Sequence, residues 1–414
     1  MFFSLLTGCS SAKRSIQKST QKDFESAFYE NQFTGFLVVD PQKKDTLLNF
    51  NGEKYFTPAS NTKIFTLFTS LNLLPDSIPA LKYIEQNNTL FVEGTGDPTL
   101  LHTYFQQNMT IDFLKGYDNI ALYLNNFQEE KLGSGWAWDD YHYYYQPEIA
   151  AFPMYGNVTT IYNSDNKNVT PSYFKDSVIA IDYRVNRELE QNQFYFSSKR
   201  KDTIEIPFRT RQTLTKGLLE KVLEKTVSIT QNMPTGEKKV LYSISSDTVL
   251  RRMMHESDNF LAEQLLVLGS STLSDTLSSA NARKYILKNQ LADLKQSPRW
   301  VDGSGLSRYN LFTPESIVDV LSKMHTQIPR KRLFSYFPAG GEAGTLEDWY
   351  AGNPNPYIYA KSGSLGNVYC LSGYLLTKSG KTLIFSFMNN HYKKSTIDIK
   401  KRMELIFEWL RDNY

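Results

Sequence analysis

Cysteine and histidine are scarce in this sequence. Among 414 residues there are only two cysteines and five histidines. The histidines are scattered, and His255-Glu256 lacks the second histidine of the zinc-binding H-E-x-x-H motif. We therefore expect no metal and no other cofactor, and we interpret His255 as a helix-packing residue. Cys370 lies in an apolar run and is expected to be a small buried side chain.

An excess of one charge and long apolar runs are also missing. Lys and Arg number 46 and Asp and Glu 43, so a net charge of +3 gives no basic footprint for nucleic acid. No stretch beyond the N-terminal leader is long enough to span a membrane. The Gly-x-Ser-x-Gly nucleophile elbow and the phosphate-cradling glycine-rich loop are absent. Aromatic residues are plentiful at 14%, and we assign most of them to the core, although carbohydrate or wall contacts would also suit them.

Three short motifs stand in order along the chain: Ser60-Asn61-Thr62-Lys63, Ser257-Asp258-Asn259 and Lys361-Ser362-Gly363. Each motif alone is a weak signal, because further copies begin at Ser10, Ser15, Ser19, Ser164, Ser172, Ser198 and Lys378. The residues around each copy distinguish the three motifs from the further copies. The copies at Ser164 lie in a polar stretch that indicates a solvated turn, and Lys378-Ser379-Gly380 has the composition of a hairpin turn.

Ser60 stands at the start of a predicted helix. Pro58 is a helix-start signal, and the run from Ile64 to Phe68 contains no helix breaker. We therefore predict Ser60 in the first turn of a buried helix, with Lys63 one turn further along the same face. A serine hydroxyl needs an adjacent base, and a buried lysine with a depressed pKa serves as that base when it is neutral.

The other two motifs also have informative surroundings. Ser257 and Asn259 interrupt the helical periodicity of residues 245–269, so we expect a break whose side chains point at a site, with a plain loop as the alternative. Lys361 ends a strand-like run. On an edge strand that pairs with an extended peptide, Lys361 would supply a positive charge for a carboxylate, and the glycine at 363 would allow close backbone approach.

The three motifs together resemble those of the low-molecular-mass penicillin-binding proteins, specifically the D-alanyl-D-alanine carboxypeptidase and endopeptidase class with a large domain inserted after the nucleophile. The resemblance runs from about residue 32 to residue 390. Its further matches are 94–100, 135–141, 302–310 and, more weakly, 344–346.

The resemblance implies an acyl-enzyme mechanism on peptidoglycan stem peptides. Ser60 would be the acylated nucleophile and Lys63 its base. Ser257 would relay a proton to the leaving amine, while Asn259 would hold Lys63 and the substrate amide.

The third motif would bind the substrate. The resemblance implies that Lys361 and Ser362, beside Gly363, bind the terminal carboxylate. The backbone N–H groups of Ser60 and Ser364 would form the oxyanion hole. β-Lactams would acylate the same serine and leave slowly.

The motif spacing and the resemblance predict an α+β fold of the β-lactamase/transpeptidase-like type. The catalytic domain would comprise residues 23–82 and 216–414, with an antiparallel sheet flanked by helices, and a mostly β inserted domain would comprise 83–215. The expected helices are 213–225, 245–269, 280–290, 314–325 and 399–411. The expected strands include 89–92, 120–124, 178–181, 356–360, 368–376 and 383–388.

Residues 1–22 resemble a bacterial lipoprotein leader. Leu6-Thr7-Gly8-Cys9 resembles a lipobox, so Cys9 would carry lipid and no disulfide would form. A chance match is the alternative. The leader is short and lacks a positive charge, which leaves a start further upstream open. The Ser-, Lys- and Gln-rich residues 10–22 are expected to be a tether. The protein would then face the periplasm of a bacterial envelope, touching the membrane only through its anchor.

Three functions fit these motifs. The first is a serine D-Ala-D-Ala carboxypeptidase or endopeptidase that binds β-lactams covalently. The second is a β-lactamase or esterase on the same scaffold. The third is a non-catalytic wall-binding lipoprotein, which the intact set of motif residues argues against. The sequence leaves the oligomeric state open.

Overall fold

The computed structural model describes residues 7–162 and 168–414, and the side chains of residues 7–12 and 15 lie outside its description. The chain forms two compact units. The first runs up to Phe68 and adds Leu250–Asp258 and Ile286–Tyr414, and the second comprises Thr69–Val249 and Asn259–Tyr285. The predicted insertion of 83–215 lies within the second unit, which also takes in flanking residues. The predicted boundaries at 82 and 216 stay a prediction.

The helices of the described residues are α1 Thr7–Phe24, α2 Lys63–Leu73, α3 Met109–Lys115, α4 Gln212–Leu223, α5 Ser246–His255, α6 Asn259–Ser271, α7 Ser279–Asn289, α8 Pro314–Gln327, α9 Arg330–Tyr336 and α10 Thr396–Asn413. Short 3₁₀ helices are η1 Ala59–Thr62, η2 Trp138–His142, η3 Tyr155–Asn157, η4 Ser172–Ser177 and η5 Gly344–Leu346.

The strands of the described residues are β1 Phe33–Asp40, β2 Asp45–Phe50, β3 Ser77–Gln86, β4 Thr89–Gly94, β5 Ile120–Tyr123, β6 Val158–Tyr162, β7 Asn168–Thr170, β8 Val178–Ile179, β9 Phe194–Tyr195, β10 Ile204–Pro207, β11 Val227–Ile229, β12 Lys239–Ser245, β13 Ile358–Leu365, β14 Val368–Leu376 and β15 Thr382–Asn390.

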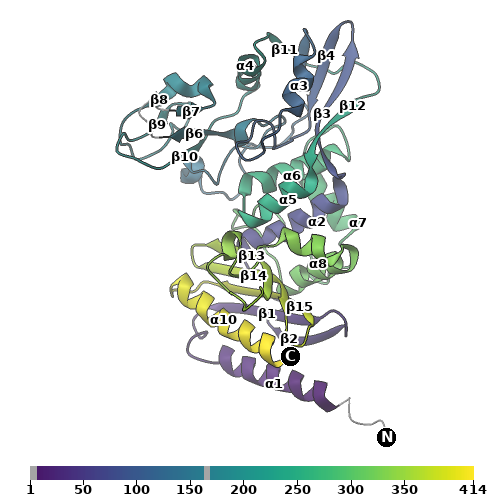
Figure 1. Cartoon of the computed structure of the whole chain (residues 1–414), viewed down its shortest axis with the longest axis vertical. Helices are drawn as coiled ribbons and strands as arrows, with labels where there is room; N and C mark the ends of the chain where they lie inside the picture. The colour runs from purple at the N-terminus through teal and green to yellow at the C-terminus, as the bar shows by residue number, and fades with distance from the viewer. Residues whose placement is uncertain (1–6, 163–167) are drawn as a thin grey trace. The chain divides into compact units, whose positions relative to one another are not determined.

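The first unit is built on a five-stranded antiparallel sheet in the order β13-β14-β15-β1-β2. Side chains alternate along β14, as a strand requires. Leu371 and Leu375 enter the core that α1 and α10 cover, whereas the Tyr374 hydroxyl on the opposite face donates to the carbonyl of Leu321 in α8. Helices therefore flank both faces of the sheet, which confirms the predicted α+β class (Figure 1).

The tether predicted for residues 10–22 is wrong, because this stretch belongs to helix α1. Ile16, Thr20 and Phe24 are spaced four residues apart, so they share one face of the helix, and all three are buried. Lys13 adds an ion pair to Asp45 at 2.5 Å. The polar composition hid this narrow apolar stripe. Met1–Leu6 of the predicted leader lies outside the described residues.

The second unit contains a mixed five-stranded sheet, β11-β5-β4-β3-β12, in which β5 pairs in parallel with β4 and with β11. Two smaller sheets, β10-β6-β7 and β8-β9, complete it. Among the described residues between 83 and 215, strands are more numerous than helices, in agreement with the predicted mostly β insertion. The strand expected at 178–181 is only the two residues of β8.

Two local predictions about the motifs can be checked in these elements. The helical stretch 245–269 breaks into α5 and α6 around Ser257, as expected. Lys378-Ser379-Gly380 forms the turn between β14 and β15, with Gly380 at a φ of 85°, which confirms its interpretation as a hairpin turn. The copies at Ser164 fall on residues 163–167, which lie outside the described part of the chain.

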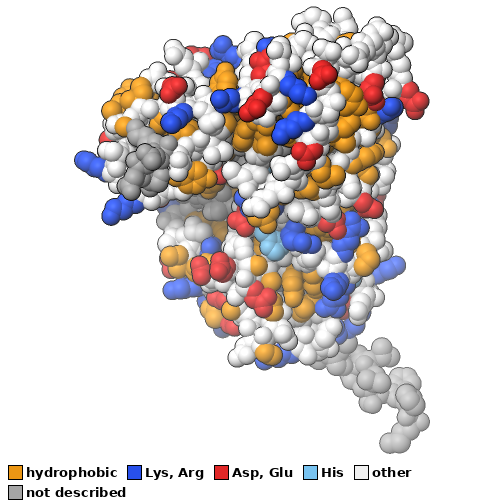
Figure 2. Space-filling model, turned by 45° about the horizontal axis from the view of Figure 1, so that its top comes forward, with side chains coloured by type: hydrophobic (Ala, Val, Ile, Leu, Met, Phe, Trp, Pro, Cys, Tyr) orange, Lys and Arg blue, Asp and Glu red, His pale blue; other side chains and the backbone are white. Residues whose placement is uncertain are grey.

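Charges of both signs are interspersed on the face shown in Figure 2, in keeping with the nearly balanced composition. Within residues 7–162 and 168–414, no helix has both the length and the apolar character that crossing a membrane requires.

Candidate active site

Ser60 lies in a tight turn that places it at the entrance to helix α2. The turn is the 3₁₀ helix η1 with Pro58 as its N-cap, and α2 begins only at Lys63, so Ser60 precedes the α-helix predicted to contain it. Ala59 adopts a φ of 47°, which is uncommon for a residue other than glycine and marks local strain at this position. The Lys63 Nζ donates to the Ser60 Oγ at 3.1 Å, so the structure brings these two predicted site residues within hydrogen-bond distance of each other.

Lys63 is fully buried, and a second contact fixes the position of its amine nitrogen. Its Nζ donates to the backbone carbonyl of Ser304 at 2.8 Å. That carbonyl belongs to the loop of residues 302–310. The Asp302 carboxylate holds the loop together by accepting from Gly305 N at 2.9 Å and from Asn310 Nδ2 at 2.7 Å. Gly305 has a φ of 84°, and a Cβ there would overlap the carbonyl of Ala59.

Asn61 joins the turn to the sheet. Its side-chain amide donates to the carbonyl of Lys361 at 2.8 Å and accepts from the Ser372 hydroxyl at 2.6 Å. All three residues are fully buried. Because an unpaired buried amide costs about 1–3 kcal/mol, these bonds fix where the turn sits on the sheet.

Lys361 lies on β13, the edge strand of the sheet, as predicted. Its Nζ donates to the Ser257 Oγ at 2.9 Å and to the carbonyl of Ser362 at 2.7 Å. The side chain is fully buried, and both of these acceptors are uncharged. Burial, and next the positive charge of Lys63, hold the pKa of Lys361 well below its usual value. The fold therefore brings the first, second and third motifs to one place through Lys63, Ser257 and Lys361.

Ser257 lies in the break between α5 and α6, with a φ of 56°. A left-handed residue cannot continue an α-helix, so its backbone ends α5 and leaves the half-buried hydroxyl at the Lys361 ammonium. His255, the last residue of α5, bonds through Nε2 to the carbonyl of Ser335 at 3.2 Å. That contact supports its interpretation as a packing residue.

Ser362, Gly363 and Ser364 follow Lys361 along the edge strand. The Ser362 hydroxyl donates to the Thr345 hydroxyl at 2.7 Å. A Cβ on Gly363 would lie 2.8 Å from the backbone nitrogen of Ser60, so only glycine allows strand and turn to approach so closely. Ser364 is exposed, close to the turn that joins β13 to β14.

Asn259 belongs to the second unit, where it is the first residue of α6. Its Nδ2 donates to the carbonyl of Tyr145 at 3.0 Å in the same unit. Its expected role toward Lys63 stays a prediction.

Several residues that build the site were not singled out from the sequence. Asn61 and the carbonyl of Ser304 position the nucleophile turn and Lys63, and Thr345 bonds Ser362. Ser304 and Thr345 lie in 302–310 and 344–346, two stretches that match the family in sequence. These matches were the sequence signal that could have identified them. Cys370 is buried, as predicted, and burial raises the pKa of its thiol to about 12.

Comparison with known proteins decides the family. The D-Ala-D-Ala carboxypeptidase 3 (S13) family matches residues 17–237 and 209–412. The chain belongs to this family. The expected class, a serine-type D-Ala-D-Ala carboxypeptidase of the penicillin-binding proteins, is thereby confirmed.

Relatives of this S13 protein cover nearly its whole length. "D-alanyl-D-alanine carboxypeptidase DacB" of Haemophilus influenzae is 22% identical over 95% of this chain and 92% of that protein. "D-alanyl-D-alanine carboxypeptidase" of Actinomadura sp. is 25% identical over 88% of this chain and 79% of that protein. The crystal structure of penicillin-binding protein 4 from H. influenzae superposes with a TM-score of 0.71 at 21% identity, covering 91% of this chain and 95% of the other. These likenesses support the predicted fold.

Proposed function

We propose that this S13 protein cleaves the terminal D-Ala-D-Ala bond of peptidoglycan stem peptides through an acyl-enzyme on Ser60. The Ser60 Oγ attacks the carbonyl carbon of the penultimate D-alanine while neutral Lys63 takes the hydroxyl proton. The carbon–nitrogen bond then breaks, and the leaving amine receives a proton relayed through Ser257. Water finally hydrolyses the ester and restores the Ser60 hydroxyl.

The observation that carries this proposal is the 3.1 Å contact between the Lys63 Nζ and the Ser60 Oγ. A candidate base has to lie within hydrogen-bond reach of the proton it removes, and this pair satisfies that requirement. The close approach of Gly363 to the backbone nitrogen of Ser60 supports an oxyanion hole made by the N–H groups of Ser60 and Ser364. Removal of one such donor typically costs about 3 kcal/mol in transition-state stabilisation.

The proposal is tested by mass spectrometry after incubation with benzylpenicillin, together with release of D-alanine from a pentapeptide. A stable protein adduct and D-alanine release are expected. Hydrolysed penicillin without an adduct would favour a β-lactamase instead. Intact penicillin with no D-alanine release would favour a non-catalytic wall-binding protein. A related H. influenzae structure, of a penicillin-binding protein 4 at 19% identity, is a complex with a β-lactam.

We expect the affinity for a free terminal carboxylate to fall as the pH rises. Lys361 is proposed to bind this carboxylate, and its lowered pKa means that it loses its charge at a lower pH than an exposed lysine. The charge-assisted bond is therefore present below that pKa and lost above it. Because such a bond is worth about 1.5–3 kcal/mol, KM should rise by about 10- to 100-fold across the transition.

The measurement is KM against pH for a D-Ala-D-Ala peptide and for the same peptide with an amidated C-terminus. The amidated peptide, which has no carboxylate, should show no such rise. If KM rose equally for both peptides at alkaline pH, Lys361 would not be the residue that binds the carboxylate.

We also propose that the protein acts in the cell envelope and is anchored by lipid on Cys9. Envelope location follows from the substrate class, and the lipobox-like Leu6-Thr7-Gly8-Cys9 supports the anchor. A single replacement, Cys9→Ser, is expected to abolish incorporation of labelled palmitate and to release the protein from the membrane fraction. Equal labelling of the variant and the parent chain would contradict the anchor.

A further inference from the structure

A cavity of about 600 Å³ lies in the second unit, lined by residues between His142 and Glu205. None of these residues belongs to the three motifs. The lining therefore contains none of the side chains proposed to act in catalysis or to bind the terminal carboxylate, and its own chemistry indicates which ligand would fit.

Exposed aromatic rings form one wall of the cavity. Tyr143 and Tyr144 line it with 42% and 65% of their surfaces exposed. Tyr143 is held in place, because its ring stacks on Tyr145 at 5.6 Å with an angle of 9° between the planes and lies 4.2 Å from the His142 ring. Flat rings fixed at the edge of a cavity offer an apolar surface to a ligand that is polar around its rim.

The remaining wall mixes hydrogen-bond donors and acceptors. Arg184, Arg200 and Asn186 bring donors, and Glu205 brings a carboxylate. The backbone N–H of Asn186 donates to the His142 Nδ1 at 3.2 Å, so the second ring nitrogen of a neutral His142 carries the proton and is a donor. Burial, and next the charge of Arg187, lower the pKa of His142, which favours this neutral form.

The contacts of the neighbouring Arg187 hold the loop that carries Arg184 and Asn186 in place. The Arg187 guanidinium, 3% exposed, donates to the carbonyl of Pro207 at 2.7 Å and to that of Glu188 at 2.6 Å. Its charge also lies 5.0 Å from the centre of the Tyr141 ring.

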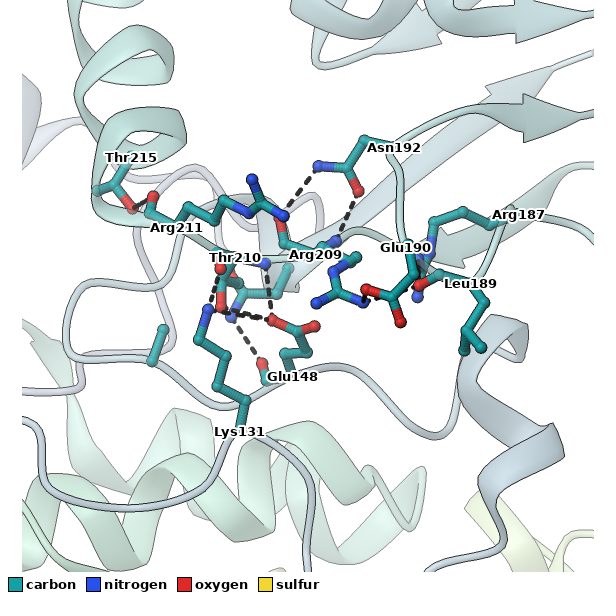
Figure 3. A network of polar contacts seen from close by, with 12 residues as sticks. Lys131, Glu148, Arg187, Leu189, Glu190, Asn192, Arg209, Thr210, Arg211 and Thr215 are labelled. Carbon is teal, nitrogen blue, oxygen red and sulfur yellow. Dashed lines mark hydrogen bonds and ion pairs between the residues drawn. The ribbon is translucent and has the colours of Figure 1, made fainter.

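A second pair of bonds closes the same loop. The Asn192 side chain accepts from Arg209 N at 2.7 Å and donates to Arg209 O at 3.0 Å. Figure 3 shows Arg187, Glu190, Asn192 and Arg209 side by side in this network. Because these bonds already fix the wall, its side chains and backbone lose little conformational entropy when a ligand binds.

We propose that this cavity binds a saccharide, with a pyranose ring stacked on Tyr144 and hydroxyl groups bonded to Arg184, Asn186 and Glu205. Each sugar hydroxyl both donates and accepts, which suits a wall that contains arginines and a carboxylate together. A simple anion would meet the Glu205 carboxylate, and an apolar ligand would cover the polar groups of this wall without forming hydrogen bonds to them. Resting on the proposed function, the saccharide is an N-acetylhexosamine unit of the glycan strand that carries the stem peptides.

The first experiment measures binding of chitotetraose, a neutral N-acetylglucosamine oligomer, to the Ser60→Ala protein by titration calorimetry. We expect Tyr144→Ala and Arg184→Gln, both at exposed positions, to weaken binding by at least about tenfold. Tyr104→Ala is the matched control, because Tyr104 is also exposed in this unit, at 55%, and does not line the cavity. Absence of binding by the parent protein, or equal loss in the control, would overturn the proposal. Inorganic phosphate that competes with chitotetraose would overturn it in favour of an anion site.

The second experiment separates this site from the catalytic one. With the Ser60 hydroxyl intact, Tyr144→Ala and Arg184→Gln should slow D-alanine release from purified sacculi several-fold and leave release from a free pentapeptide unchanged. Equal slowing on both substrates would contradict a glycan site. If the parent protein released no D-alanine from the pentapeptide but still bound chitotetraose, the proposed function would fall and the saccharide site would stand.

Discussion

Replacing Ser60 by alanine is expected to abolish both the penicillin adduct and peptidase activity. The Ser60 Oγ is the atom that forms the acyl bond in the proposed path, and the bond from the Lys63 Nζ to the carbonyl of Ser304 at 2.8 Å keeps the base in place when the hydroxyl is removed. Loss of a catalytic serine in a hydrolase of this general type costs about 10⁶-fold in kcat. Mass spectrometry of the intact protein after benzylpenicillin treatment, and kcat on a pentapeptide, measure the two losses.

The chain offers a matched control for this experiment. Ser172 and Lys175 repeat the Ser-x-x-Lys spacing, and both are exposed on the short helix η4. Ser172→Ala should keep the full adduct and full activity, because an exposed pair has neither a buried base nor an oxyanion hole beside it. If the Ser60→Ala protein still formed an adduct, another residue would be the nucleophile, and peptide mapping would identify that residue.

Local sequence signals predicted the catalytic half of the molecule well. Pro58 and the apolar run after it predicted the buried segment that places Lys63 over Ser60, because that run needs only local helical periodicity. The three strands β13, β14 and β15 were predicted near their observed positions because short apolar runs bounded by turn residues indicate strands locally. The break at Ser257 was also predicted, since polar residues between two apolar helical stretches interrupt the helix that would join them.

Contacts between distant segments were beyond this kind of prediction. The bond from Asn61 to the carbonyl of Lys361, and that from Lys63 to the carbonyl of Ser304, join segments more than about 200 residues apart. Both acceptors are backbone atoms, so no side-chain identity at the accepting position signals them. Helix α1 was missed because its buried face consists of only a few residues in a polar stretch, and packing rather than propensity stabilises such a helix.

The buried lysines also connect stability with function. Lys361 has a lowered pKa, so the unfolded chain binds a proton more tightly than the folded one, and stability should rise with pH between the lowered value and the usual value. A buried ammonium of this kind destabilises the fold, and the proposed role of Lys361 toward a substrate carboxylate would explain why it is kept.

Replacing Lys63 by alanine or methionine is expected to abolish acylation while the protein stays folded. A general base typically contributes about 10²–10⁴-fold, and Lys63 is the amine that lies within hydrogen-bond reach of the Ser60 Oγ. The cost to folding is limited. Truncation leaves the carbonyl of Ser304 without this donor, at about 1–3 kcal/mol, but it also removes a buried amine that repels Lys361 whenever it carries its positive charge. The acylation rate with benzylpenicillin and the thermal unfolding curve measure the two effects, and Lys175→Ala is the matched control.

The Lys63 variants also test the coupling between the two lysines. Without the positive charge of Lys63, the pKa of Lys361 should move back toward its usual value. Non-covalent binding of a D-Ala-D-Ala peptide to Lys63→Met should therefore persist to a higher pH than binding to Ser60→Ala, in which both lysines remain. Calorimetric titrations across the alkaline range measure this difference. Near-normal acylation by a folded Lys63→Met protein would remove Lys63 from the role of base, and an unchanged alkaline limit of binding would mean that burial alone sets the pKa of Lys361.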